Sequence, residues 1–422
     1  MPAMRALVYQ IHPLGWLACQ ALKGIWPSLR FSRVGGLAIR DVAVPKLPGD
    51  DWVLCRTLLG GICGTDLSIL NQAQPADSIL QAFSSSPMIL GHENVAVVEQ
   101  VATGVGKEWL GRRVCVEPTL CCAVRGIEPP CRSCRDGRFG VCENFGADGA
   151  GSSRLPPGTS IGYNRATGGA FGEFFVAHRS QLVPVPEGMS DEQAVLTDPL
   201  ACSLHAVLRV DLSAAARVLV YGAGVIGLGV IAALRATGYR GVIDALDRAD
   251  YLGDLARSMG ADEFLLSPRR SADRFAMVAR RTGGTVHRVR FGNHMLSGGY
   301  DAVFDCVGGA ESLNECLKWC AAGGQVVMVG TGGRAADLTA VWFTELRVLG
   351  AYGRGMELFE GRRIATYPLV HEWLAGGRLK TAALLTHTFP LADYRHAIEV
   401  ASRKSAWAAV KVAFDFRPLR RA

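Results

Sequence analysis

The stretch GGICGTDLSIL, residues 60–70, places a thiol, a hydroxyl and a carboxylate within four positions. These groups belong to Cys63, Thr65 and Asp66. A lone cysteine is usually a small, buried apolar residue, so Cys63 by itself indicates no chemistry. A reactive thiol and a metal ligand are the alternatives, and the rest of the chain has to decide between them.

Other side chains that bind metals are dispersed along the chain. His92 and Glu93 lie in ILGHENV, and Asp198 lies in LTDPLACSLHAV. A catalytic zinc takes about three protein ligands and keeps one position for water or substrate. A cysteine, a histidine and a carboxylate meet that need. Each of these residues alone is a weak signal, because a single histidine in an apolar strand is more often structural.

Thirteen cysteines are many for a cytosolic protein, and six of them fall between residues 115 and 142. In a reducing compartment such a cluster indicates metal binding more than disulfides. Four thiolates suit a tetrahedral zinc that is closed to solvent and holds together a segment without a core of its own. A redox pair and spare thiols are the alternatives, and Cys121 competes as the first ligand. The expected ligands are Cys122, Cys131, Cys134 and Cys142.

The stretch VLVYGAGVIGLGVIAALRATG contains the glycine pattern of dinucleotide-binding folds, directly after an apolar strand and at the start of a helical run. Gly222 permits the tight turn, Gly224 lets the backbone approach a pyrophosphate, and Gly227 allows close helix packing. The helix N-terminus supplies N–H groups to the phosphates. A glycine turn in some other α/β sheet is the alternative. The residues expected at the cofactor here are Gly222, Gly224, Val225, Ile226 and Gly227.

The next strand, GVIDAL, is followed by Asp247, twenty residues after Gly227. A carboxylate at this position accepts hydrogen bonds from the ribose hydroxyls and repels a 2′-phosphate, which favours NAD over NADP. Arg248 follows directly and softens that preference. Two further residues are expected at the cofactor: Val307 in YDAVFDCVG and Gly330 in QVVMVG.

The elements that position these residues are of two kinds. Residues 38–59 and 87–118 are rich in Val, Leu and Ile with Gly and Pro between them, which predicts short strands of a β-rich domain. From about residue 203, apolar strands alternate with Ala-rich helical runs, which predicts a parallel sheet in an α/β fold. Residues 11–37 predict one short apolar helix ended by Pro27. We expect this segment to pack on the protein's own core or at a subunit interface, with a membrane surface as the alternative.

The bulk composition narrows the class of protein. The 422 residues are 49% hydrophobic and 20% charged, which is typical of a folded chain with two or three domains. No apolar run reaches the 18 residues that span a membrane, and MPAMRALVYQ lacks a secretory pattern, so we expect a cytoplasmic protein. The net charge is +7, but no nucleic-acid-binding module is found, so we expect a solvated basic face rather than a nucleic-acid partner.

The motifs form a pattern when they are taken in chain order. They are GICGTD, GHE, the four cysteines, a carboxylate–Pro–Leu segment with His205 downstream, and GxGxxG. This pattern resembles the zinc-dependent medium-chain alcohol dehydrogenases, especially the branch with polyol and threonine dehydrogenases. The resemblance covers nearly the whole chain and implies an active site between two domains. The implied parts are a GroES-like β-rich catalytic domain over residues 1–202 with a structural-zinc lobe at about 119–145, a doubly wound Rossmann NAD-binding domain over 203–349, and a return to the catalytic domain over 350–422.

The resemblance also implies roles for the residues. Cys63, His92 and Asp198 would hold the catalytic zinc, and Glu93 would be an alternative or nearby ligand. Asp66 would orient the metal-bound histidine, as metal sites in general require. Thr65 would accept the proton of the substrate hydroxyl. The four cysteines of the lobe would hold the structural zinc.

Some positions depart from the family pattern. Asp198 stands where this branch often has Glu, and Ser68 stands where many relatives have a proton-relaying histidine. The first gap between the lobe cysteines is eight residues, where the family usually has two. The insert at 11–37 and the extra length around 286–298 are absent from typical members. These departures leave the substrate open.

We therefore expect an NAD- and zinc-dependent oxidoreductase that oxidises a secondary alcohol or polyol-like substrate to a carbonyl. Its partner would be this small molecule, and the chain would form a homodimer or homotetramer. An NADP-preferring carbonyl reductase of the same family is the first alternative. A cofactor-binding scaffold without turnover is the second, although it would have no need of an open metal site.

Overall fold

The computed structural model describes residues 3–10, 12–73, 78–146, 155–330, 335–381 and 383–417. The chain divides into two compact units. Unit 1 comprises Met1–Asp198 and Ala383–Ala422, and unit 2 comprises Pro199–Ala382. Over the described ranges, we find no helix with the length and apolar character that a membrane crossing requires.

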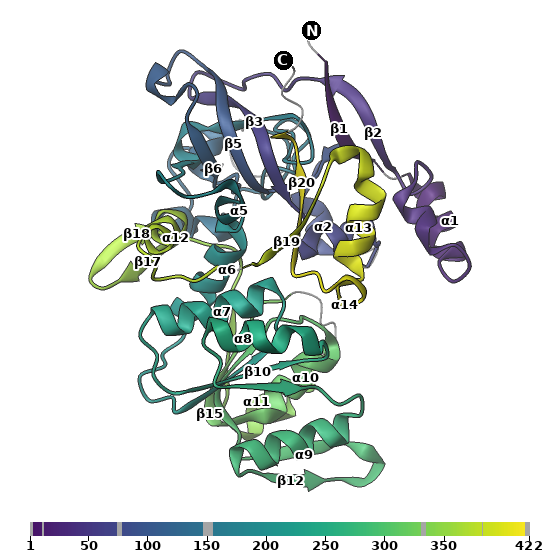
Figure 1. Ribbon diagram of the computed structural model, residues 1–422, viewed down its shortest axis with the longest axis vertical. Helices are drawn as coiled ribbons and strands as arrows, with labels where there is room; N and C mark the ends of the chain where they lie inside the picture. The colour runs from purple at the N-terminus through teal and green to yellow at the C-terminus, as the bar shows by residue number, and fades with distance from the viewer. Residues whose placement is uncertain are drawn as a thin grey trace. The chain divides into compact units, whose positions relative to one another are not determined.

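Unit 1 is built mainly from antiparallel strands (Figure 1). Its strands are β1 Ala3–Tyr9, β2 Leu37–Ala43, β3 Trp52–Gly61, β4 Met88–Ile89, β5 Glu93–Val101, β6 Arg113–Val116, β7 Phe174–His178, β8 Leu182–Pro184, β19 Leu385–Phe389 and β20 Lys411–Asp415. The larger sheet has seven strands in the order β19-β20-β3-β5-β6-β8, with β7 also paired to β3, and the smaller has the order β2-β1-β4. Strand β3 lies centrally and is apolar on both faces, so it is almost wholly buried.

The helices of unit 1 are short, because strands and loops fill most of its length. They are α1 Pro13–Leu22, α2 Gly64–Leu70, α3 Cys122–Arg125, α4 Arg132–Arg135, α5 Asp191–Ala194, α13 Tyr394–Ser402 and α14 Lys404–Trp407. The amphipathic helix α13 buries its apolar side in a core formed with α2, β1 and β20. This packing joins the C-terminal segment to the helix that follows Cys63.

Unit 2 contains a parallel six-stranded sheet in the order β11-β10-β9-β14-β15-β16. Helices α7 and α8 lie on one face, and α9, α10 and α11 lie on the other (Figure 1). Strand order reverses beside β9, which creates the crevice at the carboxyl ends where such folds bind dinucleotides. The sheet strands and its helices are β9 Arg217–Tyr221, β10 Val242–Asp247, β11 Glu263–Leu266, β14 Tyr300–Asp305, β15 Cys320–Met328, β16 Arg347–Gly350, α7 Val225–Ala236, α8 Gly253–Met259, α9 Ser271–Thr282, α10 Ala310–Trp319 and α11 Thr339–Phe343.

The unit boundaries differ from the expected divisions after residues 202 and 349. Helix α6, Thr197–Leu208, begins in unit 1 and continues in unit 2, while residues 350–382 all belong to unit 2. These residues form the hairpin β17 Met356–Phe359 with β18 Arg362–Ala365 and helix α12 Thr366–Ala375. Polar contacts explain why residues 350–382 belong to unit 2. The Glu357 carboxylate lies 2.7 Å from Nδ1 of His205, and Arg378 donates a hydrogen bond to the Ala236 carbonyl.

The two segments that depart from the family pattern form local structures. The segment around 286–298 forms the hairpin β12 Thr285–Arg288 with β13 His294–Ser297. The insert forms α1, which ends at Leu22 rather than near Pro27, because a turn through Gly24 precedes a 3₁₀ helix, Pro27–Phe31.

Candidate active site

Three potential metal ligands meet where β3 ends and β5 begins. The antiparallel register pairs Gly61 with Glu93, and Cys63 follows two residues later at the N-cap of α2. The pairing therefore brings Cys63 to the residues that open β5. One donor atom each of Cys63, His92 and Glu93 lies within 4.8 Å of the others. His92 and Glu93 are buried, and Cys63 is partly exposed.

Asp66 connects two of these three residues. Its Oδ2 accepts a hydrogen bond from the backbone N–H of Cys63 at 3.0 Å, which caps α2. Its Oδ1 accepts a hydrogen bond from the Tyr163 hydroxyl at 3.0 Å and lies 3.7 Å from Nδ1 of His92. Because the Nδ1 edge of the imidazole faces Asp66, Nε2 is the nitrogen that remains for a metal. This arrangement is typical of a carboxylate that orients a metal-binding histidine.

The electrostatics of this cluster favour a cation. Burial lowers the pKa of His92, but the negative charges of Cys63 and Asp66 outweigh burial and raise that pKa well above its ordinary value. The same surroundings that favour a proton on the imidazole also favour a metal ion beside it. The mixture of sulfur, nitrogen and carboxylate donors is one that zinc accepts. The residues present therefore fit a catalytic zinc.

Glu93 has a buried partner that lies far away in the sequence. Its Oε2 forms an ion pair with Nζ of Lys411 on β20, and both side chains are only 2% exposed. Nζ also donates to the Ile62 carbonyl at 3.0 Å. Burial lowers the pKa of Lys411, but the Glu93 carboxylate outweighs it and raises that pKa. Lys411 thus stays charged and stabilises the buried carboxylate.

The remaining residues predicted for this site lie in two places. Thr65 is beside the cluster, with its Oγ1 3.7 Å from Sγ of Cys63. Ser68 lies one turn further along α2 and is half-buried. Asp198 is buried in the first turn of α6, but it is not a member of the group whose donor atoms lie within 4.8 Å of one another.

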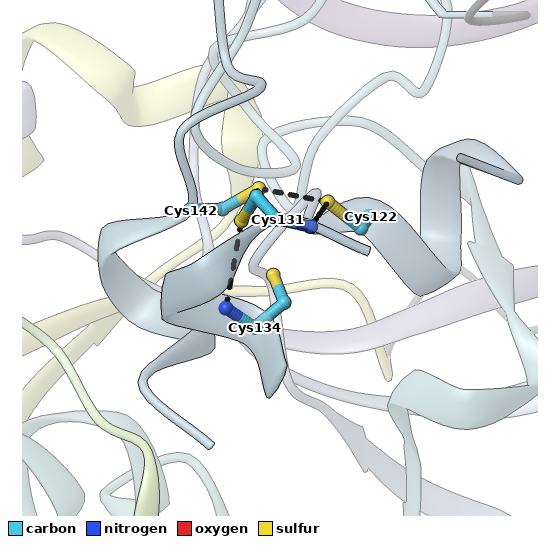
Figure 2. Close-up of side chains that lie close together, drawn as sticks. All are labelled: Cys122, Cys131, Cys134 and Cys142. Atoms are coloured by element: carbon cyan, nitrogen blue, oxygen red, sulfur yellow. Dashed lines mark hydrogen bonds between the residues drawn. The ribbon is translucent and has the colours of Figure 1, made fainter. Parts of the chain in front are cut away.

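The four predicted lobe cysteines lie together (Figure 2). The Sγ atoms of Cys122 and Cys142 are 3.6 Å apart, and those of Cys131 and Cys142 are 3.9 Å apart. All four sulfurs lie within 4.8 Å of one another, and Cys121 does not belong to the group. Four converging sulfurs are the donor set of a closed zinc site.

Nitrogen donors surround these sulfurs. The backbone N–H groups of Cys131 and Cys134 donate to Cys122 and Cys131, and the Asn144 side chain donates to Cys122 at 3.1 Å. Burial raises the pKa of Cys131, but the N–H donors outweigh it and lower that pKa to about 7. The apolar core beneath the lobe is small, with the lobe cysteines themselves among its members. A metal therefore fits as the bond that holds the segment together.

The predicted glycine turn of unit 2 follows β9 and precedes α7. Gly222 has a φ of +97°, which a side chain rarely adopts. A Cβ on Gly227 would collide with the Gly222 carbonyl, whereas one on Gly224 would meet no protein atom. The open face of Gly224 leaves room for a phosphate at the helix N-terminus. At the end of β10, Asp247 accepts hydrogen bonds from the backbone N–H groups of Ala223 and Ala249, at 2.7 and 2.9 Å.

The other residues predicted at the cofactor lie near the same strand ends. Val307 follows β14 and is about half exposed, and Gly330 follows β15, where its N–H donates to the Asp305 carbonyl. Arg248 donates to Glu311 at 3.2 Å. Glu311 is itself held by the fully buried Arg274. The arrangement fits a dinucleotide whose ribose would lie beside Asp247.

Comparisons with known proteins agree with this arrangement. The alcohol dehydrogenase GroES-like domain matches residues 49–187, and the zinc-binding dehydrogenase family matches residues 225–373. L-Threonine 3-dehydrogenase of Rhizobium etli is 30% identical over 367 residues, which are 86% of this chain and 91% of that protein. The chain belongs to the zinc-dependent medium-chain dehydrogenase family.

Two further proteins are similar to this medium-chain dehydrogenase. L-Idonate 5-dehydrogenase of Vitis vinifera is 28% identical over 383 residues, 90% of this chain and 92% of that protein. The crystal structure of L-idonate 5-dehydrogenase from Escherichia coli K-12 shares the fold, with a TM-score of 0.70, 21% identity and coverage of 98% and 99%. The predicted family, its polyol and threonine branch and its α/β fold are confirmed, and the chain is an oxidoreductase.

Sequence reasoning about this dehydrogenase missed Tyr163 and Lys411. The contact between Tyr163 and Asp66 spans 97 positions and leaves no local signal. Lys411 did leave one: it is a lone cation at the start of the apolar strand VKVAFD, and a buried charge needs a partner. The sequence could therefore have predicted that Lys411 has an acidic partner, but not that the partner is Glu93.

Proposed function

We propose that this medium-chain dehydrogenase oxidises a secondary alcohol with NAD, and that Cys63, His92 and Glu93 hold its catalytic zinc. The observation that carries the proposal is the convergence of a thiol, an imidazole and a carboxylate within 4.8 Å. Three ligands leave one tetrahedral position for the substrate oxygen. When bound, zinc supplies a Lewis acid at that oxygen, and NAD accepts the hydride.

The third ligand in this proposal is Glu93 rather than Asp198. Glu93 belongs to the cluster, whereas Asp198 does not, and an aspartate is one methylene shorter than the glutamate usual at its position. Asp198 is nevertheless close enough to Lys411 to contribute to raising its pKa. We assign Asp198 to the electrostatic surroundings of the site rather than to the metal.

The chain's own residues then perform three tasks. Cys63 and Glu93 would supply negative charge to the metal, and Asp66, 3.7 Å from Nδ1 of His92, would leave Nε2 as the nitrogen that binds it. Thr65, whose Oγ1 lies 3.7 Å from Sγ of Cys63, would accept the proton of a substrate hydroxyl that binds beside this sulfur and would pass on a proton of its own. Ser68 has no basic nitrogen that could accept a proton as a histidine would, so the proton would pass from Thr65 to solvent. The four lobe cysteines hold a second zinc with a structural role.

The preference for NAD rests on two carboxylates. Asp247 lies where the ribose hydroxyls would bind and would repel a 2′-phosphate. Arg248, which could attract that phosphate, is paired with Glu311 at 3.2 Å. Glu311 is in turn anchored by Arg274. We propose that this pairing prevents Arg248 from attracting a 2′-phosphate and so preserves the preference for NAD over NADP.

This part of the proposal has its own test. Glu311→Gln should raise kcat/KM for NADP about threefold and leave that for NAD unchanged, since exposed charges act weakly through water. Glu263→Gln is the matched control, because Glu263 pairs with Arg257 at 3.4 Å elsewhere in unit 2. A Glu311→Gln enzyme with an unaltered ratio of NADP to NAD would refute the role of the pair.

The names of the relatives support a substrate class. Two are named for oxidation of threonine at carbon 3 and of idonate at carbon 5, and both of these carbons carry secondary hydroxyls. We propose a secondary hydroxyl as the shared feature. A panel of amino alcohols, polyols, sugar acids and simple secondary alcohols, followed by NADH absorbance with NADP in parallel, tests the proposal. Turnover of secondary alcohols that is lost in Cys63→Ser supports it, and turnover unaffected by Cys63→Ser contradicts it.

A further inference from the structure

Helix α1 exposes its apolar residues to solvent. Leu14 and Leu17 are one turn apart, and they are 81% and 56% exposed. The opposite side of the helix carries Cys19, its only buried residue. An ordinary surface helix turns its apolar side toward the core, whereas α1 is apolar on both sides, with Trp16 half-buried near Cys19 and Leu14 and Leu17 exposed.

The turn after α1 extends the apolar surface. Ile25 is 85% exposed and Trp26 is 58% exposed, and Leu22 just before them is exposed as well. Figure 1 shows α1 at the margin of unit 1, beyond β1 and β2. We call Leu14, Leu17, Leu22, Ile25 and Trp26 the α1 patch. Five exposed large apolar side chains within thirteen residues are a candidate interaction site.

The charged residues of the insert that carries the α1 patch are all positive. The insert, residues 11–37, contains Lys23, Arg30 and Arg33 and no Asp or Glu. Lys23 and Arg33 are exposed, whereas Arg30 lies over the Phe31 ring at 4.8 Å. The partner of this surface must therefore tolerate apolar contact and attract cations.

A second copy of the chain is a poor partner on these grounds. A two-fold contact through the α1 patch would bring the same patch from both subunits together, and with it two all-cationic inserts. Like charges at an interface oppose association. An anionic lipid surface instead offers an apolar interior below a layer of negative charge.

We propose that the α1 patch docks this dehydrogenase on an anionic membrane surface. Leu14, Leu17 and Ile25 enter the acyl boundary, and Trp26 lies at the headgroup level that indole rings prefer. Lys23 and Arg33 contact lipid phosphates. Helix α1 is too short to span a bilayer, so it lies on the surface. Gln20 donates to Gln72, just after α2, and connects the docking element to the rest of unit 1.

Vesicle co-sedimentation of the full-length protein tests this proposal. The vesicles contain either phosphatidylcholine alone or phosphatidylcholine with phosphatidylglycerol, at low and high salt. One variant, Leu14→Ser/Leu17→Ser/Ile25→Ser/Trp26→Ser, removes the apolar contacts. A second, Lys23→Glu/Arg33→Glu, changes only exposed charges and guards against misfolding of the first. Leu110→Ser/Leu358→Ser is the control, because both leucines are exposed outside the patch.

The proposal predicts binding to phosphatidylglycerol vesicles that weakens at high salt. Each patch variant should bind about tenfold more weakly, and the control should bind like the wild type. Absence of binding to the anionic vesicles would overturn the proposal, as would binding that both patch variants retain. A fall in oligomeric mass of the patch variants without vesicles, measured by light scattering, would assign the patch to a second copy instead.

Discussion

The two clusters of unit 1 that we propose as zinc sites are built in opposite ways. The lobe uses four identical donors from residues 122–142, and backbone N–H groups of the same segment surround its sulfurs. The cluster at Cys63, His92 and Glu93 mixes three kinds of donor, and its supports are Asp66, Tyr163 and Lys411 from three parts of the chain.

This difference separates a cluster suited to stabilising the fold from a cluster suited to catalysis. Four local sulfurs fill a tetrahedral site and leave no position for a substrate. Three mixed donors leave one position open, and the supports fix their orientation without closing the site. We therefore expect changes at the lobe to alter stability, and changes at the Cys63 cluster to alter turnover.

The largest expected effect comes from His92→Gln. It removes a proposed zinc ligand, and kcat/KM for the best alcohol should fall roughly 10³-fold, or about 4 kcal/mol of transition-state stabilisation. The unfolding temperature should change little. Steady-state kinetics and circular dichroism measure the two quantities. A His92→Gln enzyme that unfolds like the wild type but retains most activity would contradict the assignment.

The next effect is on stability and comes from Cys131→Ser. Loss of one sulfur from a closed site should cost about 3 kcal/mol and lower Tm by roughly 6–12 °C. The kcat of the molecules that remain folded should stay near that of the wild type. Calorimetry and active-site-normalised kinetics test this, with Cys19→Ser as the control because Cys19 lies outside both clusters. An unchanged Tm would contradict a structural role for the lobe cysteines.

Local sequence patterns predicted much of the fold. The apolar strand, glycine turn and helical run at 217–236 became β9, the turn at Gly222 and α7, because hydrogen bonds between near neighbours define such units. The four lobe cysteines were also predictable, since a short segment brings its own ligands together. The helix in the insert was predicted, although it ends earlier than expected.

Contacts between distant residues could not be predicted in this way. The pairs Glu93–Lys411 and Asp66–Tyr163 depend on strand register and on loops that only the folded chain defines. The same limit applies to residues 350–382, where contacts to α6 and α7 place the segment in unit 2. For α1, the sequence predicted a short apolar helix but not that Leu14 and Leu17 would face solvent.

A moderate effect is expected from Asp66→Asn. The neutral amide loses the charge that holds His92 and weakens the cap on α2, so zinc affinity and kcat/KM should fall about 10- to 100-fold. Zinc affinity is measured by competition with a chelator. Asp136→Asn, which changes an exposed lobe carboxylate, is the control. Equal zinc affinities for Asp66→Asn and the wild type would show that the Cys63 cluster does not depend on this carboxylate.

The smallest effect is expected from Tyr163→Phe, which removes one hydrogen bond to the buried Asp66. The cost should be about 1–2 kcal/mol, seen as a roughly fivefold to thirtyfold loss of zinc affinity. The absorption bands of the cobalt-substituted enzyme should shift as well. Tyr394→Phe is matched, because its hydroxyl donates to the Phe31 carbonyl away from both clusters. Identical spectra for Tyr163→Phe and the wild type would show that Tyr163 does not help to position the Cys63 cluster, and only Asp66 and Lys411 would keep that role.

Zinc content per chain, measured by plasma mass spectrometry on folded protein, tests the central claim most directly. We predict about two zinc ions in the wild type and about one in both Cys63→Ser/His92→Gln and Cys131→Ser/Cys142→Ser. Only Cys131→Ser/Cys142→Ser should show a large fall in Tm. A wild-type content near one, or a Cys63→Ser/His92→Gln variant that keeps two ions, would contradict the assignment of two distinct zinc sites.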